Sequence, residues 1–413
     1  MRRASPEPSH LWQHELTVPV PAHTRLIFDA DYGSYMDDSF ALAFALGSPE
    51  LELELALATG GPRPEARAAV LARHLDEAGR GHIPVGLSPA ADTELDIGAL
   101  LGWGAEYDLN SYPAGPPVTD GVEAAARVVR RRAAEGQQVT WAILGPSSAA
   151  ASFASRFPEL VQHVRIVVMG ASICTGMPSP WADPEEDGGG SPRYPQAATN
   201  ERQNVPAARA MIRAPWGGGP PTFTGIRPTL DVQLGGAQYR RLRGASDDPV
   251  GYPALTPLFD SYLSWWTASS QMSNDGPTGR ANDGTGAEVT STADEAASLD
   301  PLSASVVMFD VLAVFLAFSQ RGLVVVTLEA DFTDDGHTAL SAADAGRQIL
   351  PSGCDVTRAR LLPANAGQTG AAAFPLVDIA VGWQSAGQLE LFKKELLIRL
   401  LRGGLPCAAA DAS

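Results

Sequence analysis

Short apolar runs alternate with amphipathic runs along the first 170 residues of the chain. The apolar runs lack a polar face, which is typical of strands covered on both sides, while the amphipathic runs have a helical period. A strand followed by a helix, repeated several times, indicates parallel strands joined by crossover helices. We therefore predict an α/β fold with a largely parallel central sheet and helices on both faces. The predicted strands are 25–31, 51–61, 139–145 and 164–170, and the predicted helices are 37–48, 65–79, 121–135 and a short one from Ser147.

The chain shows neither an internal repeat nor a clean linker between two cores, so we expect a single domain at 24–402. Two stretches inside it, 178–195 and 271–301, are rich in Gly, Ser, Pro, Asp and Thr. They offer too little apolar surface to fold alone and are predicted to be surface insertions in mobile loops. Residues 1–23 are predicted to be a flexible extension, and 403–413 a flexible tail.

Composition and net charge exclude some classes of binding partner. The chain has 413 residues, of which 45% are hydrophobic and 19% charged, and this is an ordinary globular composition. Its net charge of −17, without a basic stripe, would repel phosphate backbones and anionic lipid, so we expect no nucleic-acid or membrane partner. Three widely spaced cysteines form no disulfide or zinc pattern, and the N-terminus lacks the apolar stretch of a secretory signal. These features predict a cytoplasmic protein.

The segment IFDADYGSYMDDSFAL carries four carboxylates within ten residues: Asp29, Asp31, Asp37 and Asp38. The first two end a predicted strand and the last two open a helix, and ligands of α/β sheets bind at such strand ends. Helix capping explains one or two of these acids but not four. Their mutual repulsion calls for a cation or a set of donors, and hard oxygen ligands without His or Cys favour calcium or magnesium over zinc.

The run D-A-D-Y-G-S-Y-M-D-D resembles the D-x-D-x-G-x-D-D fingerprint of the inosine-uridine preferring nucleoside hydrolases, in a longer form with two extra residues before the last acid pair. Later segments resemble further family motifs in the same order, and the matches extend from about residue 25 to residue 402. The chain is thus identified as a divergent member with a nucleoside hydrolase-like fold. The later segments are GPSSAAA (145–151), VVMGAS (167–172), NERQNVPAA (200–208), MFDVLA (308–313) and FTDDGHT (332–338).

The resemblance implies a calcium ion held by Asp31, by both oxygens of Asp38, by the Ser148 carbonyl and by Asp310. Sugar hydroxyls and one water would complete a shell of six to eight oxygens, as calcium prefers. Asp31 would also be the general base that takes a proton from water. The implied reaction is calcium-dependent hydrolysis of the N-glycosidic bond of ribonucleosides, which yields free base and ribose.

The resemblance also implies the substrate contacts. Asp37 and Asn200 would hold the ribose 2′- and 3′-hydroxyls, and Met169 would line the sugar pocket. The implied partner is a small-molecule nucleoside. Because the family is commonly dimeric or tetrameric, a homo-oligomer is implied as well.

Each later assignment has a plainer alternative. Asp310 precedes an apolar helix and would serve equally as its N-cap. Asn200 would serve as a turn or cap residue, and Met169, at the end of a buried strand, as core filler. Only their joint order along the chain favours the functional interpretation.

The departures from the family pattern concentrate on the nucleobase and the 5′ end of the sugar. Phe309 stands where many members have a His that protonates the leaving base. Met177 replaces an Asn and Ala198 a Glu, both 5′-hydroxyl contacts, and Gly61 replaces an Asn near the ribose. We hypothesise that the substrate lacks a free 5′-hydroxyl or carries a larger, less polar group there.

The sequence assigns no leaving-group acid, and it leaves the preferred base open. Tyr262, Trp265 and Trp266 are candidates for stacking on a base, although an adjacent Trp pair in a helix is more often half core and half surface.

Two rival interpretations remain. A haloacid dehalogenase-like phosphatase would also place D-x-D after a strand, but Gly33 departs from its pattern and the only lysines, Lys393 and Lys394, lie near the C-terminus. The second rival is a catalytically silent homologue that binds calcium and a sugar, which the substitutions at 177, 198 and 309 favour. Retention of the four predicted metal ligands argues against it.

Overall fold

The structure is a computed structural model of the whole chain. The predicted extension, tail and insertions lie wholly or largely outside the residues that it describes, as does Met177, so those predictions stay predictions. It describes residues 23–89, 98–173, 198–243, 255–274, 281–282, 288–289, 304–341, 344, 348–349, 354–355, 360–361 and 374–403.

The centre of the molecule is a ten-stranded sheet with the strand order β13-β10-β9-β14-β6-β5-β4-β1-β2-β3. The seven strands from β14 to β3 are parallel, and β9 runs antiparallel to both β14 and β10. The largely parallel sheet is as predicted, whereas the antiparallel edge was not foreseen. The strands are β1 Thr24–Ala30, β2 Leu51–Ala58, β3 Val85–Leu87, β4 Val139–Ile143, β5 Val164–Val168, β6 Thr222–Phe223, β9 Leu323–Phe332, β10 Thr338–Leu340, β13 Arg360–Leu361 and β14 Leu376–Trp383.

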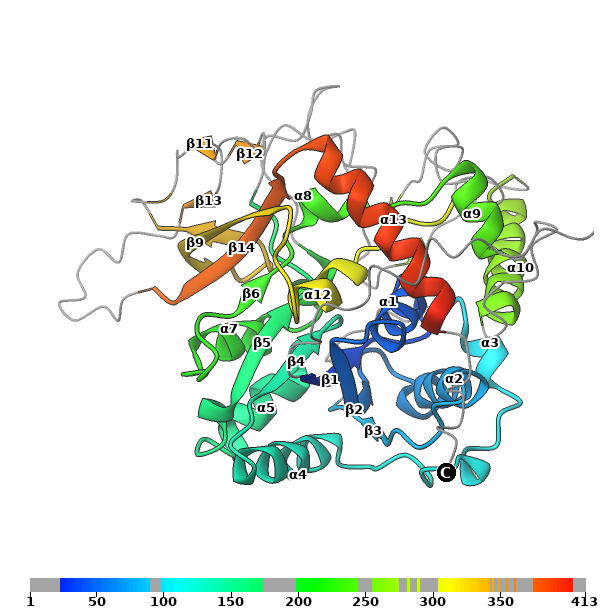
Figure 1. Cartoon of the computed structure of the whole chain (residues 1–413), viewed down its shortest axis with the longest axis horizontal. Coiled ribbons are helices and arrows are strands. Elements are labelled where there is room, and N and C mark those ends of the chain that lie inside the picture. The colour runs from blue at the N-terminus through cyan, green and yellow to red at the C-terminus, as the bar shows by residue number, and fades with distance from the viewer. Residues whose placement is uncertain are drawn as a thin grey trace, which may run out of the picture.

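Helices cover both faces of this sheet, as predicted (Figure 1). One face is covered by α1 Asp37–Leu46, α2 Pro64–Glu77, α12 Val311–Leu316 and α13 Ala386–Gly403, and the other by α4 Gly121–Ala134, α5 Ser148–Arg156 and α7 Val205–Arg213. The remaining helices are α3 Leu101–Gly104, α6 Thr199–Gln203, α8 Ile226–Thr229, α9 Gly236–Leu242 and α10 Leu255–Asn274, with 3-10 turns η2 Leu109–Ser111 and η3 Val161–His163. Two short strand pairs, β7 Ala281–Asn282 with β8 Glu288–Val289 and β11 Gln348–Ile349 with β12 Cys354–Asp355, lie outside the main sheet.

The alternation of side chains along β1 explains why helices pack on both faces of the sheet. Leu26 and Phe28 belong to the hydrophobic cluster under α1 and α2, whereas Ile27 belongs to the cluster under α4 and α5. All three side chains are fully buried. Burial of each contributes about 1.5–3 kcal/mol, which is why an apolar run without a polar face is stable at this position.

Aromatic packing docks α12 and α13 against α1. Phe315 of α12 packs edge-on against Phe392 of α13, with ring centroids 5.0 Å apart, and Phe392 also contacts Phe44 of α1 at 6.2 Å. Helix α1 contacts both α12 and α13. Residues about 270 positions apart in sequence are thereby brought close together.

The strand order reverses at β1, because the chain proceeds from β1 through β2 to β3 on one side and continues with β4, β5 and β6 on the other. Such a switch point leaves a crevice between the loops that follow the two central strands, and ligands of open α/β sheets bind there. Here those loops follow β1 and β4. Among the described residues, no helix has the length and hydropathy needed to span a bilayer.

Candidate functional site

Three carboxyl groups converge at the switch point. Asp37 and Asp38 open α1, and Asp310 immediately precedes α12. Their carboxylate oxygens lie within 4.8 Å of one another, and the carboxyls of Asp38 and Asp310 each act on the other's pKa. Asp38 and Asp310 are 2% and 4% exposed, so water does little to screen their repulsion.

Asp31 lies directly beyond β1, beside these three acids. Its Oδ2 accepts a hydrogen bond of 3.0 Å from Ser34 Oγ, and its charge acts on the carboxyls of Asp37, Asp38 and Asp310. The turn after β4 forms the wall behind it: a Cβ added to Gly145 would lie 2.9 Å from the Asp31 nitrogen and 3.1 Å from its Oδ1. Four carboxyl groups, Asp31, Asp37, Asp38 and Asp310, thus form one acid cluster.

The electrostatics of the acid cluster would be eased by a cation. Burial, and next the charge of Asp31, raises the pKa of Asp37 to about 7. Burial followed by the neighbouring carboxylates raises the pKa values of Asp38 and Asp310 well above the ordinary range. Burial also raises the pKa of Asp31, and the Arg67 charge opposes that shift. Ionised acids packed in this way are costly unless a positive charge offsets them.

The donor set fits a hard divalent ion. Calcium–oxygen bonds of about 2.3–2.6 Å let one ion contact oxygens up to about 5 Å apart, which is the spread of Asp37, Asp38 and Asp310. Asp38 Oδ1 is buried and has no hydrogen-bond partner among the described residues. A buried acceptor of this kind requires an explanation, and a bound cation supplies one.

The capping alternatives do not account for these acids. The N-cap of α1 is Met36, and it makes no side-chain cap bond. Asp310 occupies the N-cap position of α12, but its carboxylate does not bond to the helix N–H groups. Asp310 therefore sits at a helix start without capping it, whereas the backbone N–H groups of Asp37 and Asp38 bond to the Asp37 carboxyl but do not offset the effect of its burial.

Asn200 and Met169 meet at the ends of β4 and β5. Asn200 Nδ2 donates to the carbonyls of Leu144, at 2.7 Å, and Met169, at 3.2 Å, and lies 3.7 Å from the Met169 sulfur. The cap of α7 is instead Asn204, whose Oδ1 accepts from Ala207 N. Met169 is buried in the main core as well, so its packing role and its contact with Asn200 coexist.

Ser148 is the first residue of α5, in the loop that backs Asp31. Its hydroxyl accepts a hydrogen bond of 2.9 Å from Asn204 Nδ2, which fixes the start of α5 against α7. The predicted role of its carbonyl stays a prediction.

Asp29 does not belong to the acid cluster. It is still within β1, fully buried, and accepts hydrogen bonds from Trp141 Nε1 at 3.1 Å and Ser88 Oγ at 3.2 Å. Burial outweighs these donors and raises its pKa to about 7. The fourth member of the cluster is Asp310 rather than Asp29, because Asp31 lies past the strand end whereas Asp29 is held inside the sheet.

Aromatic side chains lie beside the acid cluster. Tyr35, from the two-residue extension of the first motif, packs edge-on against Trp265 of α10, with centroids 6.1 Å apart, and Trp265 packs on Tyr262 at 5.8 Å. Burial, then the charges of Asp37 and Asp31, raises the pKa of Tyr35 to about 12, and burial also raises that of Tyr262. Both phenols therefore keep their protons at neutral pH. The side chain of Trp266 lies outside the described part.

Two of the described positions that depart from the family pattern carry apolar side chains, and at the third the space for a side chain is occupied by Arg67. Ala198 is buried at the start of α6, and Phe309 is half-buried against the main core. A side chain at Gly61 would collide with the guanidinium of Arg67, since a Cβ there would lie 2.5 Å from its Nη2.

Sequence reasoning missed Arg67, Tyr35 and Glu201. Arg67 is 1% exposed, although it stands on the inward face of α2 at helical spacing with Val70, Leu71 and His74. A charged residue within an apolar helix face was the available signal. Glu201 directly follows Asn200, and burial raises its pKa to about 8. No pattern distinguished it from a surface Glu of the first helical turn.

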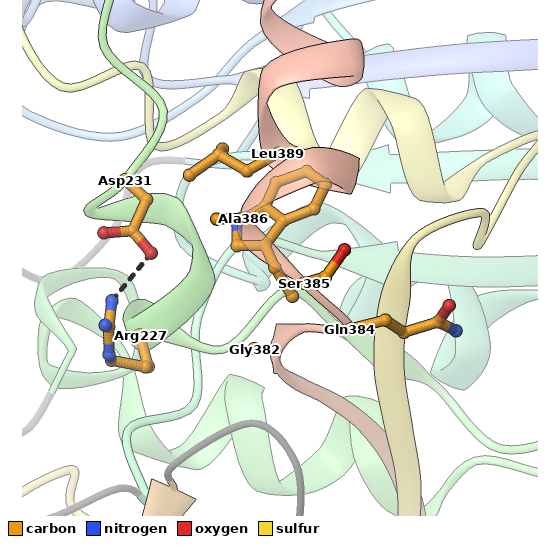
Figure 2. A pocket seen from close by; sticks show the side chains of 8 residues that line it. Arg227, Asp231, Gly382, Gln384, Ser385, Ala386 and Leu389 are labelled. Atoms are coloured by element: carbon orange, nitrogen blue, oxygen red, sulfur yellow. Dashed lines mark hydrogen bonds and ion pairs between the residues drawn. The ribbon is translucent and has the colours of Figure 1, made fainter.

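A cavity of about 300 Å³ lies elsewhere on the same edge of the sheet, between α8 and the turn from β14 to α13. Figure 2 shows that the charged groups of Arg227 and Asp231 face each other, at 2.9 Å, while Gln384 points away. The Trp383 indole N–H is held by the Pro228 carbonyl. Four strand positions, about 19 Å, separate β14 from β1, so this cavity is distinct from the acid cluster.

Comparison with known proteins gives a consistent result. The sequence model of the "Inosine-uridine preferring nucleoside hydrolase" family matches residues 26–360. A pyrimidine-specific ribonucleoside hydrolase, RihA, of Salmonella typhimurium is 32% identical over 247 residues, which are 58% of this chain and 71% of the relative. For RihA of Salmonella typhi the matched segment is 165 residues, 38% of this chain and about half, 51%, of the relative.

Solved structures share the fold. A purine-preferring ribonucleoside hydrolase from Gardnerella vaginalis superimposes with a TM-score of 0.58 over 92% of this chain and 99% of its own, at 18% identity. An inosine-guanosine nucleoside hydrolase gives 0.58 at 14% identity, over 92% and 99% of the two chains. The phosphatase alternative has no support here. The chain belongs to the inosine-uridine preferring nucleoside hydrolase family, the members of which are hydrolases that act on N-glycosidic bonds.

Proposed function

We propose that this chain hydrolyses the N-glycosidic bond of ribonucleosides in a calcium-dependent reaction that releases free base and ribose. The observation that carries the proposal is the meeting of Asp37, Asp38 and Asp310 within 4.8 Å, with Asp31 beside them, at the switch point of the sheet. Carboxylates this close to one another in a buried site repel, and a bound cation would offset that repulsion.

Asp31, Asp38, Asp310 and the Ser148 carbonyl are the proposed calcium ligands; of these, Asp38 and Asp310 belong to the group whose oxygens lie within 4.8 Å of one another, whereas Asp31 lies beside that group. When bound, calcium would orient a water molecule and lower its pKa, so that a neighbouring carboxylate can take its proton. With all four acids ionised the cluster carries −4; Arg67 contributes +1 and a divalent ion +2, which leaves −1. A residual negative charge suits a reaction in which the anomeric carbon becomes cationic as the base departs.

Asp31 is the proposed general base. Its position past the end of β1, held by Ser34, presents the carboxylate to the crevice between the β1 and β4 loops. Asp37 and Asn200 are proposed to hold the ribose hydroxyls. Both Asn200 amide hydrogens are directed to the strand-end carbonyls of Leu144 and Met169, so its Oδ1 is turned away from them and accepts from a hydroxyl.

Tyr35, Trp265 and Tyr262 are proposed to line the nucleobase side of the site. They supply flat apolar area and phenolic donors beside Asp37, where Phe309 offers no proton. The relatives include a pyrimidine-specific and a purine-preferring enzyme, so both base classes belong in the assay.

The apolar 5′ half remains a hypothesis. Ala198 is buried and offers no hydrogen bond to a 5′-hydroxyl. We expect 5′-deoxynucleosides to be hydrolysed at least as fast as ordinary nucleosides. A strong preference for the free 5′-hydroxyl would refute this expectation.

The alternative is a homologue that binds calcium and sugar without catalysis, and Phe309 in place of an acid favours it. The discriminating experiment incubates purified protein with purine and pyrimidine nucleosides, with calcium or with EGTA, and measures reducing sugar. Ribose release that EGTA abolishes supports the enzyme. Calcium binding without ribose release from any nucleoside supports the silent homologue.

A homo-oligomer, dimer or tetramer, and a cytoplasmic location remain predictions. Light scattering on the eluted full chain tests the first, and cell fractionation tests the second.

A further inference from the structure

A buried arginine reaches the loop that carries the acids. Arg67 lies in the first turn of α2, and its side chain crosses to the segment between β1 and α1. It is 1% exposed. A buried guanidinium is costly unless its donors and its charge are satisfied, so its position requires specific partners.

Three of its hydrogen bonds go to residues 31–34. Arg67 Nη1 donates to the Asp31 carbonyl at 2.9 Å, to the Tyr32 carbonyl at 3.3 Å and to Ser34 Oγ at 2.8 Å. Ser34 Oγ in turn donates to Asp31 Oδ2 at 3.0 Å. One guanidinium therefore fixes the backbone on which Asp31 stands and, through Ser34, the rotation of its carboxylate.

The surroundings leave the guanidinium little freedom. Gly61, at φ +63°, lies so close that a Cβ there would be 2.5 Å from Arg67 Nη2. Gly145 also lies against Asp31, with a Cβ position 3.1 Å from Asp31 Oδ1. The Asp31 carboxylate therefore has Gly145 and Ser34 as close neighbours, and Ser34 is held by Arg67.

We infer that Arg67 is a positioning residue of the reaction: acting through Ser34, it holds the Asp31 carboxylate in the orientation in which that group binds calcium and faces water. This inference rests on the proposed function. Partners of a metal ligand that orient it from outside the coordination shell typically contribute 10–100-fold to metal affinity or activity. A shift of about 1 Å in a reacting group has a comparable effect on rate.

The test uses R67K, which keeps the positive charge but loses the planar fork, and S34A, which removes the link to Oδ2. The matched control is R73K, because Arg73 stands on the same helix but bonds to the Trp103 carbonyl and Glu77. Calcium affinity is measured by isothermal titration, and kcat and KM by ribose release. Thermal melts establish that each variant is folded.

We expect R67K and S34A each to weaken calcium binding about 10–100-fold and to lower kcat by a similar factor, with KM changed less than about 3-fold. The double variant should lose less than the product of the two single losses, because both act on one carboxylate. R73K should change neither quantity. If R67K does not fold, the calcium affinity and kcat of S34A alone decide whether the inference holds.

A merely structural Arg67 would lower the melting temperature and leave the calcium affinity and kcat of the folded protein unchanged, and that result overturns the inference. If the wild-type chain releases no ribose, the proposed function fails, but the titration still decides the inference. Calcium affinities of R67K and S34A equal to wild type would then reject it.

Discussion

Glu201 provides a sharp test of the electrostatics next to the site. Its side chain is 3% exposed, and Oε1 accepts one hydrogen bond of 3.3 Å from Ala171 N. Oε2 is buried without a hydrogen-bond partner among the described residues. Burial raises the pKa of this carboxyl from 4.5 to about 8. The folded protein therefore holds a proton on Glu201 that the unfolded chain releases above about pH 4.5.

The direction in which stability changes with pH follows from this difference in bound protons. Between the two pKa values the folded state binds more protons, so the free energy of unfolding falls as pH rises from about 4.5 to 8. At pH 7 the acid lowers stability by about 3 kcal/mol, and at pH 5 by about 1 kcal/mol. E201Q keeps the shape of the neutral acid and cannot ionise, so it should raise stability by these amounts.

The assay is thermal unfolding by calorimetry at pH 5 and pH 7. An unfolding entropy of about 2.1 cal/mol/K per residue converts the gain at pH 7 to about 4 °C for 413 residues. The control is E50Q: burial raises the pKa of Glu50, but hydrogen bonds of 2.6 and 2.8 Å from Arg399 outweigh it and lower the net value. E50Q should therefore destabilise at pH 7. An E201Q variant that melts at or below the wild-type temperature at pH 7 would refute the reasoning.

Four further predictions follow from the same site. Calcium at 100 times its dissociation constant should stabilise the protein by about 2.7 kcal/mol, or about 3 °C, and a melt unchanged between calcium and EGTA would contradict this. Calcium affinity should fall between pH 8 and pH 6, because Asp37, which adjoins the proposed ligands and has a pKa of about 7, gains a proton there and loses the negative charge that attracts the ion, and titrations of equal affinity at the two pH values would argue against a carboxylate site. N200A should lower kcat/KM about 10–100-fold through the lost hydroxyl contact, measured by ribose release, and an unchanged value would remove Asn200 from the site. W265A should raise KM about 5–30-fold by removing a stacking surface worth about 1–2 kcal/mol, with kcat less affected, whereas an unchanged KM would place the base elsewhere.

Much of the fold was predictable because its dominant signal is local. The all-apolar run at 25–31 and the helical run at 37–48 correspond to β1, Thr24–Ala30, and α1, Asp37–Leu46. Asp31 and Asp38 were identifiable because both lie in one motif at a strand end. The antiparallel strand β9, Leu323–Phe332, was not predicted, since its pairing with β14 depends on contacts distant in sequence.

The remaining site residues show the limit of local reasoning. Asp310 was identified only through a family resemblance, because nothing near it in sequence indicates that Phe315 and Phe392 dock α12 against α1. Arg67 was overlooked because a guanidinium 36 residues from Asp31 has no motif, and only the folded chain shows that it bonds to that residue's carbonyl.

The central claim is that one divalent ion draws Asp31, Asp38 and Asp310 together, and calcium titration of the wild-type chain and of D310N tests it most directly. The account predicts one calcium per wild-type chain and an affinity at least about 100-fold weaker in D310N, which remains folded without calcium because the substitution removes a buried repulsion. Equal affinity and stoichiometry in the two proteins would contradict it.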